Sequence, residues 1–124
     1  MAGKKVLVVD DSPTAVMWQS MILRQGQYEV VTAADGQAGV DAAMAEQPDL
    51  ILMDVVMPRM NGFEACRAIR GTAATKHVPI IMVTTRSEMA SVEEGFESGC
   101  SEYITKPIDR FELLAKVDSY LRAA

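Results

Sequence analysis

The feature that most constrains the fold of this chain is an alternation of short apolar runs with longer helical patterns, which repeats five times. Three of the runs, 6–9, 50–53 and 79–83, are apolar almost throughout, as expected of strands buried on both faces of a sheet. The run at 28–33 is more polar and is expected at a sheet edge, and a short fifth strand is expected at 103–104. This alternation predicts right-handed crossovers and a parallel sheet with helices on both faces.

The segments between the runs carry signals for the beginning and end of helices. Ser12 and Pro13 supply an N-cap and a first-turn proline for a helix that ends near Gln25. Asn61 and Glu64 form a capping-box pattern for a helix that ends near residue 70. The other helices are expected over 36–46, from Ser87 to about Gly99, and after an Asp109 cap, the last with an apolar stripe of Phe111, Leu114, Val117 and Leu121. The prediction is one doubly wound α/β domain over residues 1–124, with five strands and five helices.

The first helix has two apolar stripes, and one face of a sheet can cover only one of them fully. The stripes are Ala15, Trp18 and Ile22, and Val16, Met17 and Met21. The second stripe either belongs to a large core that leaves some methyl groups exposed, or is a docking patch for a partner helix.

Composition and charge exclude several classes of function. A net charge of −5 disfavours binding to nucleic acid, because phosphate backbones select basic surfaces. No apolar run is long enough to span a bilayer, and the one near the N-terminus is too short for a signal peptide, so we expect a cytoplasmic protein without a membrane partner. Cys66 and Cys100 fit no metal-site spacing and are expected to be free thiols. His77 and Arg70 are interpreted as solvated residues.

Polar side chains follow four of the expected strands at the point where each strand ends. They are Asp10 and Asp11 after the first, Asp54 after the third, Thr84 and Thr85 after the fourth, and Lys106 after the fifth. Because ligands of parallel α/β sheets bind beyond the carboxyl ends of the strands, we expect these residues to form one site.

Such an acidic cluster requires a compensating positive charge, and Lys106 supplies only one. Mg²⁺ suits the site, with Asp11, Asp54 and the Val56 backbone carbonyl as direct ligands and Asp10 acting through water; a calcium loop would need more ligands. A carboxylate is also a competent phosphoryl acceptor, with Lys106 and Thr84 available to bind the transferring oxygens.

These residues resemble the receiver domain of two-component response regulators, most of all the stand-alone, CheY-like type. The resemblance spans essentially the whole chain. It is carried by Asp10-Asp11, by Met53-Asp54 with Met57-Pro58 and Gly62, by Thr84, and by Tyr103 before Lys106-Pro107. It implies a flavodoxin-like fold with strand order 2-1-3-4-5.

The resemblance also implies a function and its residues. Asp54 would be the phosphoacceptor, with Asp10, Asp11 and the Val56 backbone at Mg²⁺ and with Thr84 and Lys106 reading the phosphoryl group. Tyr103 would be the switch aromatic, and the Lys106-Pro107 bond would be cis. The partners would be a sensor histidine kinase or a histidine phosphotransfer protein, and a downstream protein on the surface of the fourth helix, fifth strand and fifth helix. The protein would not be a conventional enzyme, although it would catalyse its own phosphorylation and slow dephosphorylation.

Two positions depart from the usual pattern. Thr85 stands where the family commonly has alanine or glycine, and its bulk would restrict entry to the pocket. Val56 cannot hydrogen-bond an attacking water through its side chain, which predicts a long-lived phosphoryl form.

Three other functions share parts of this pattern. A haloacid-dehalogenase-type phosphatase would need a second aspartate where Val56 stands. A flavin- or nucleotide-binding module shares the fold, but the sequence has no glycine-rich phosphate loop. A receiver-like interaction domain that is never phosphorylated normally lacks an acidic or lysine position, and all are present here. The chain is either a whole protein or an excised domain, and its ends favour the former.

Overall fold

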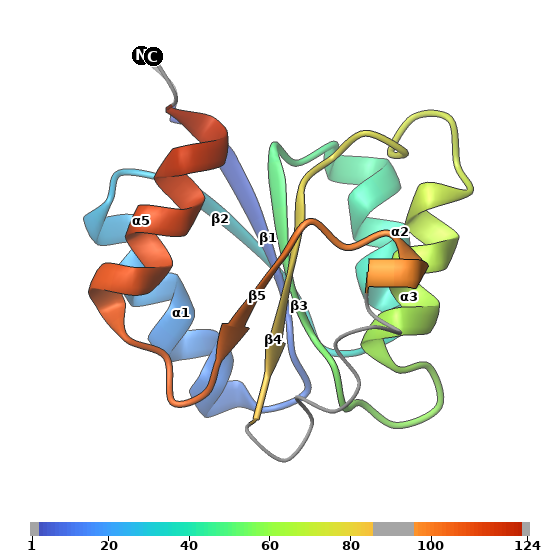
Figure 1. Cartoon of the computed structure of the whole chain (residues 1–124), viewed down its shortest axis with the longest axis horizontal. Helices are drawn as coiled ribbons and strands as arrows, with labels where there is room; N and C mark the ends of the chain where they lie inside the picture. The colour runs from blue at the N-terminus through green and yellow to red at the C-terminus, as the bar shows by residue number, and fades with distance from the viewer. Residues whose placement is uncertain (1–2, 86–95, 123–124) are drawn as a thin grey trace.

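A computed structural model describes residues 3–85 and 96–122 as a single parallel sheet with helices on both faces. The strands are β1 (Lys5–Val9), β2 (Glu29–Ala33), β3 (Leu50–Asp54), β4 (Ile80–Thr84) and β5 (Glu102–Thr105). The helices are α1 (Pro13–Gln25), α2 (Gly36–Glu46), α3 (Gly62–Arg70) and α5 (Arg110–Leu121). Helices α1 and α5 cover one face of the sheet, and α2 and α3 cover the other (Figure 1).

The strand order is β2-β1-β3-β4-β5, which confirms the predicted doubly wound topology and places β2 at an edge. All four strand pairings are parallel. The predicted caps are also present, because the side chains of Ser12, Asn61 and Asp109 each accept a backbone N–H of the first turn of their helix. The helix expected from Ser87 falls largely outside the described residues, although 96–98 are helical.

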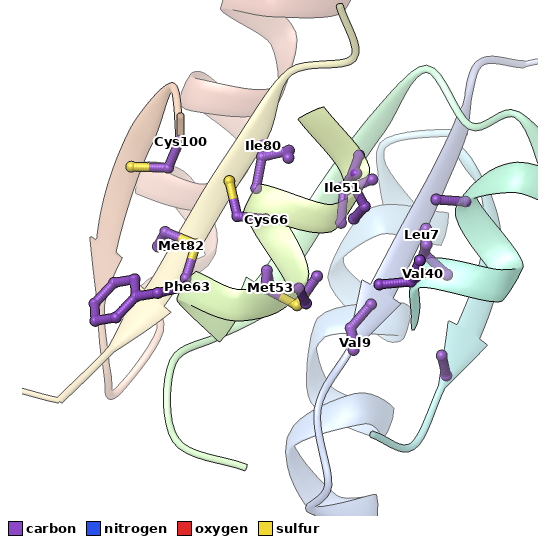
Figure 2. Close-up of a cluster of buried hydrophobic side chains, with 14 of the residues drawn as sticks. Leu7, Val9, Val40, Ile51, Met53, Phe63, Cys66, Ile80, Met82 and Cys100 are labelled. Atoms are coloured by element: carbon purple, nitrogen blue, oxygen red, sulfur yellow. The ribbon is translucent and has the colours of Figure 1, made fainter. Parts of the chain in front are cut away.

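Each buried strand contributes alternate side chains to two cores, one on each face of the sheet. Under α2 and α3 lie Leu7, Val9, Ile51, Met53, Ile80 and Met82, together with Phe63 and Cys66 from α3 (Figure 2). Under α1 and α5 lie Val6, Val8, Leu50, Leu52, Ile81 and Val83. This division explains why the strands read as continuous apolar runs.

One expectation about a helix face needs correction. Phe111 belongs to the predicted buried stripe of α5, but it is 73% exposed, and Leu113, which lies outside that stripe, is buried in its place; Val117 is buried as predicted. On a helix, residues 111 and 113 point in nearly opposite directions, and the packing against β1 and β3 selects the face of Leu113. On α1, the exposed apolar residues Met17, Trp18 and Met21 come from both candidate stripes.

Both cysteines are buried free thiols, as predicted. Burial, followed by the neighbouring Cys66, raises the pKa of the Cys100 thiol to about 11. Within the described residues, no helix is long and apolar enough to cross a membrane.

Arg70 was wrongly interpreted as a solvated charge. Its Nε donates to the Gly99 carbonyl at 2.8 Å, and its Nη1 donates to the carbonyls of Val78 at 2.6 Å and Lys76 at 3.2 Å. Gly99 has a φ of +103°, a conformation that favours glycine. The guanidinium therefore ties the end of α3 to the approaches of β4 and β5.

We expect Arg70→Ala to lower the free energy of unfolding by about 2 kcal/mol, because three backbone carbonyls lose a charged donor. Urea unfolding would measure the change. Arg24→Ala is the matched control, since Arg24 is an exposed arginine in the last turn of α1, and we expect it to shift stability by less than about 0.5 kcal/mol. Equal effects of the two substitutions would contradict the bridging role of Arg70.

Candidate functional site

Asp54 is the last residue of β3, and its carboxylate lies at the carboxyl edge of the sheet. Strand β1 runs parallel beside β3, so Asp10 and Asp11, which follow β1, emerge at the same edge. One carboxylate oxygen from each of Asp10, Asp11 and Asp54 lies within 4.8 Å of the other two. Asp10 and Asp54 are buried and Asp11 is exposed, so the cluster opens to solvent on the side of Asp11.

Lys106 follows β5 and reaches across the end of β4 into this cluster. Its Nζ lies 3.1 Å from Asp54 Oδ1 and 3.2 Å from Asp10 Oδ2. Its backbone N–H donates to the carbonyl of Thr84 at 2.6 Å, which fixes the start of the loop that carries it. The Lys106–Pro107 peptide bond is cis, the conformation that the resemblance implied.

The close carboxylates perturb one another. Burial, and then the neighbouring Asp10 carboxylate, raise the pKa of Asp54 to about 6, although Lys106 opposes the shift. Burial by itself would lower the pKa of Lys106, but the carboxylates of Asp54 and Asp10 outweigh it and raise that pKa. One ammonium is therefore firmly charged, and the cluster retains an excess of negative charge.

Asp10 is held by donors that the sequence did not reveal. The backbone N–H of Ser12 donates to Asp10 Oδ1 at 2.9 Å, and Gln19 Nε2 lies 3.5 Å from Oδ2. Gln19 is 1% exposed, and its Nε2 also donates to the Ala15 carbonyl. A single glutamine within a helical pattern gave no signal of this role, which depends on how α1 packs over β1.

The two threonines at the end of β4, Thr84 and Thr85, differ in environment. Thr84 is the last residue of β4 and is fully buried, and its hydroxyl donates to the carbonyl of Thr85 at 3.3 Å. Thr85 is half-buried beyond the end of the strand.

Tyr103 lies in β5 and is half-buried. Its ring centroid is 5.4 Å from that of Phe96, with the rings tilted at 59°. Tyr103 also packs against the core cluster under α2 and α3.

The loop after Asp54 is folded tightly against the end of β3. The Gly62 N–H donates to the Val55 carbonyl at 2.8 Å, and a Cβ at Gly62 would collide with the Asp54 carbonyl. Met57 is buried and anchors the loop, whereas Val56, two residues after Asp54, is 58% exposed. Glycine at position 62 thus permits the close turn that leaves the Asp54 side chain facing the site.

Comparison with known proteins places this site in a family. Residues 6–118 match the family model described as "Response regulator receiver domain". Protein PilH of Pseudomonas aeruginosa is 38% identical over 117 residues, which cover 94% of this chain and 97% of PilH. Response regulator PleD of Caulobacter vibrioides is 40% identical over 118 residues, which cover 95% of this chain but only 26% of PleD.

Solved structures agree with this assignment. The chemotaxis protein CheY4 of Vibrio cholerae superposes with a TM-score of 0.90 at 38% identity, over 97% of this chain and 100% of that one. The receiver domain of the sensor histidine kinase PA1611 from Pseudomonas aeruginosa superposes with a TM-score of 0.90 at 32% identity, over 98% of this chain and 100% of that one. That structure has a magnesium ion coordinated in its active-site cleft. The chain is a response regulator receiver domain, a member of the CheY-like family of phosphorelay signalling proteins.

Proposed function

We propose that this receiver domain, over residues 1–124, is switched by phosphorylation of Asp54, with a phosphohistidine of a sensor histidine kinase or phosphotransfer protein as donor. The observation that carries the proposal is the position of the Asp54 carboxylate. It ends β3 inside an acidic cluster and is ion-paired at 3.1 Å with Lys106. An aspartate so placed is a nucleophile with a cation ready for the arriving oxygens.

The transfer forms a bond between an Asp54 carboxylate oxygen and phosphorus and breaks the bond between phosphorus and the histidine nitrogen. The leaving imidazole keeps the electron pair of the broken bond, and it is neutral because its other nitrogen retains a proton or because the vacated nitrogen takes one from solvent. Lys106 stabilises the negative charge on the transferring oxygens, and its two ion pairs hold the ammonium where those oxygens arrive. The chain thus promotes its own modification without being a conventional enzyme.

The donor set fits Mg²⁺. Three carboxylate oxygens lie within 4.8 Å of one another, and hard oxygen ligands with excess negative charge are what this ion selects. Asp11, Asp54 and the Val56 carbonyl would be its direct ligands, and Asp10, which is already engaged by Lys106 and Ser12, would act through water. When bound, Mg²⁺ would neutralise charge on the phosphoryl oxygens.

Thr84 and Tyr103 would respond to the phosphoryl group by changing the partner-binding surface. The Thr84 hydroxyl now donates to Thr85, and a new dianion at Asp54 would compete for that donor. Movement of Thr84 and its loop would let Tyr103, now packed on Phe96, turn inward. The phosphoryl group would thereby shift an existing balance between two forms of the surface of the fourth helix, β5 and α5, where we place the downstream partner.

Two alternatives have less support. The comparisons give no support to a haloacid-dehalogenase-type phosphatase, and Val56 occupies the place of its second aspartate. The intact set of acidic residues and lysine argues against a receiver-like domain that is never phosphorylated. These residues are Asp10, Asp11, Asp54 and Lys106.

Incubation with a small acyl phosphate and Mg²⁺ should add the mass of one phosphoryl group to the wild-type chain. Asp54→Asn should stay unmodified, because an amide is not a competent acceptor. Intact mass spectrometry measures both. Asp41→Asn is the control, since Asp41 is an exposed acid on α2. An unmodified wild type, with the small donor and with a cognate kinase, would refute the function.

In the absence of divalent cations, Asp54→Asn should stabilise the fold by about 1–2 kcal/mol in urea unfolding at pH 7, because it removes a buried repulsive charge. A carboxyl whose pKa is raised to about 6 destabilises the folded state as pH rises from about 4 through 6. The gain should therefore shrink at pH 4. Mg²⁺ should stabilise the wild type and should have little effect on Asp54→Asn. A loss of stability in Asp54→Asn under chelator would contradict this electrostatic account.

Val56 predicts a slow loss of the phosphoryl group, because its exposed side chain cannot hydrogen-bond an attacking water. We expect Val56→Asn to shorten the phosphoryl lifetime about 3- to 10-fold by orienting that water. Decay of the modified mass after donor removal measures the lifetime. Val56→Ala, which adds no polar group, should change it less than about twofold. Similar decay in all three proteins would rule out this role for position 56.

A further inference from the structure

The segment that carries Lys106 is tied to α1 by Trp18. The indole Nε1 of Trp18 donates to the backbone carbonyl of Ile108 at 3.2 Å, across 90 positions of sequence. Ile108 lies two residues beyond Lys106, between the end of β5 and the start of α5. Trp18 is the only tryptophan of the chain, and it is 44% exposed, so burial in the core does not account for its presence.

The indole also lines a groove beside the acidic cluster. This groove, of about 370 Å³, is bounded by Trp18, Ala15 and the start of α1 on one side and by Lys106, Pro107 and Ile108 on the other. Figure 1 shows α1 and α5 side by side on this face of the sheet, with the connection from β5 passing beside the first turn of α1. Trp18 therefore contacts the lysine-bearing segment from the helix that follows Asp10 and Asp11.

The position of this segment matters because Lys106 must satisfy two carboxylates at once. Its Nζ lies 3.2 Å from Asp10 and 3.1 Å from Asp54, and a long flexible side chain holds such a position only if its backbone is fixed. The Lys106 N–H to Thr84 bond fixes the segment on the strand side. The Trp18 to Ile108 bond is the corresponding tie on the other side, toward α1.

The hydrogen bond between Trp18 and Ile108 contributes little to the stability of the fold. Both partners of the Trp18 bond are near the surface, so water can replace the indole N–H at the Ile108 carbonyl and the fold loses little. The rate of phosphoryl transfer to Asp54 is more sensitive to the position of Lys106, because displacing a charge-stabilising group by about 1 Å can lower the rate by a large factor.

We propose that Trp18 is a positioning residue for phosphoryl transfer: its indole N–H, bonded to the Ile108 carbonyl, holds the Lys106 segment so that the ammonium stays between Asp10 and Asp54. The inference rests on the proposed function, since it assigns Trp18 a part in modification of Asp54. It adds to that function a residue of α1 that touches neither the reacting carboxylate nor the phosphoryl group.

A double-mutant cycle with a small acyl phosphate as donor tests the proposal. Trp18→Phe keeps an aromatic ring and removes the N–H donor, and we expect it to slow phosphorylation about 3- to 10-fold with a Tm within about 3 °C of wild type. In a Lys106→Met background the same substitution should change the remaining rate less than about twofold, because no ammonium is left to position. A purely structural role would slow both backgrounds alike.

Phe111→Leu is the matched control, because Phe111 is an exposed aromatic at the start of α5 with no bond to the Lys106 segment among the described contacts. It should leave the rate within about twofold of wild type. Equal rates for Trp18→Phe and wild type would overturn the proposal while leaving the proposed function intact. Loss of the fold in Trp18→Phe would also overturn it, since Trp18 would then act on stability. A wild type that is never modified would instead refute the proposed function.

Fluorescence provides a readout that does not depend on activity. Because Trp18 is the sole tryptophan, titration of the wild type with Mg²⁺ alone should change its emission as the charges around Lys106 rearrange. The change should be reduced by more than about half in Lys106→Met, if the segment transmits it. Unchanged emission, at Mg²⁺ concentrations that raise the Tm of the wild type, would show that Trp18 and Lys106 are not linked.

Discussion

Three carboxylates can lie together at one edge of this sheet because Lys106 is placed among them. Asp10 and Asp54 are nearly inaccessible to water, and two bare negative charges at such sites would repel strongly. The ammonium at 3.1 and 3.2 Å offsets that repulsion in part and leaves the cluster short of positive charge. A bound cation would offset that remaining negative charge, and under the proposed function the cation and Lys106 together would offset the charge of the phosphoryl group.

The fold supplies this arrangement through the parallel sheet. The ends of β1, β3 and β5 bring Asp10, Asp54 and Lys106 together, although about 50 residues separate each from the next. Supporting contacts then restrict each group: Gln19 and Ser12 on Asp10, the turn at Gly62 behind Asp54, and Trp18 on the segment after Lys106. These groups are therefore held by elements from both faces of the sheet, α1 on one and the start of α3 on the other.

Much of this was predictable from the sequence because its signals are local or topological. Continuous apolar runs predict buried parallel strands, and Ser12, Asn61 and Asp109 mark helix starts that the structure confirms. Parallel strands with helical crossovers also fix which strand ends share an edge, so the grouping of the acids with Lys106 followed without coordinates. Where a local signal had two solutions, sequence reasoning failed. The apolar stripe predicted for α5 included Phe111 and omitted Leu113, and only packing against the sheet showed that Leu113 is the buried one.

The sequence by itself determined the order of the elements, the two-sided burial of the strands and the identity of the residues at the reactive edge, because each of these depends on periodicity or on position along the chain. The tertiary structure alone decided which side chains support that edge. Arg70 joins three backbone carbonyls, Gln19 faces Asp10, and Trp18 reaches Ile108, and none of these contacts has a sequence signature. They arise from the distance and angle at which packed elements meet, and no pattern within a single element specifies those.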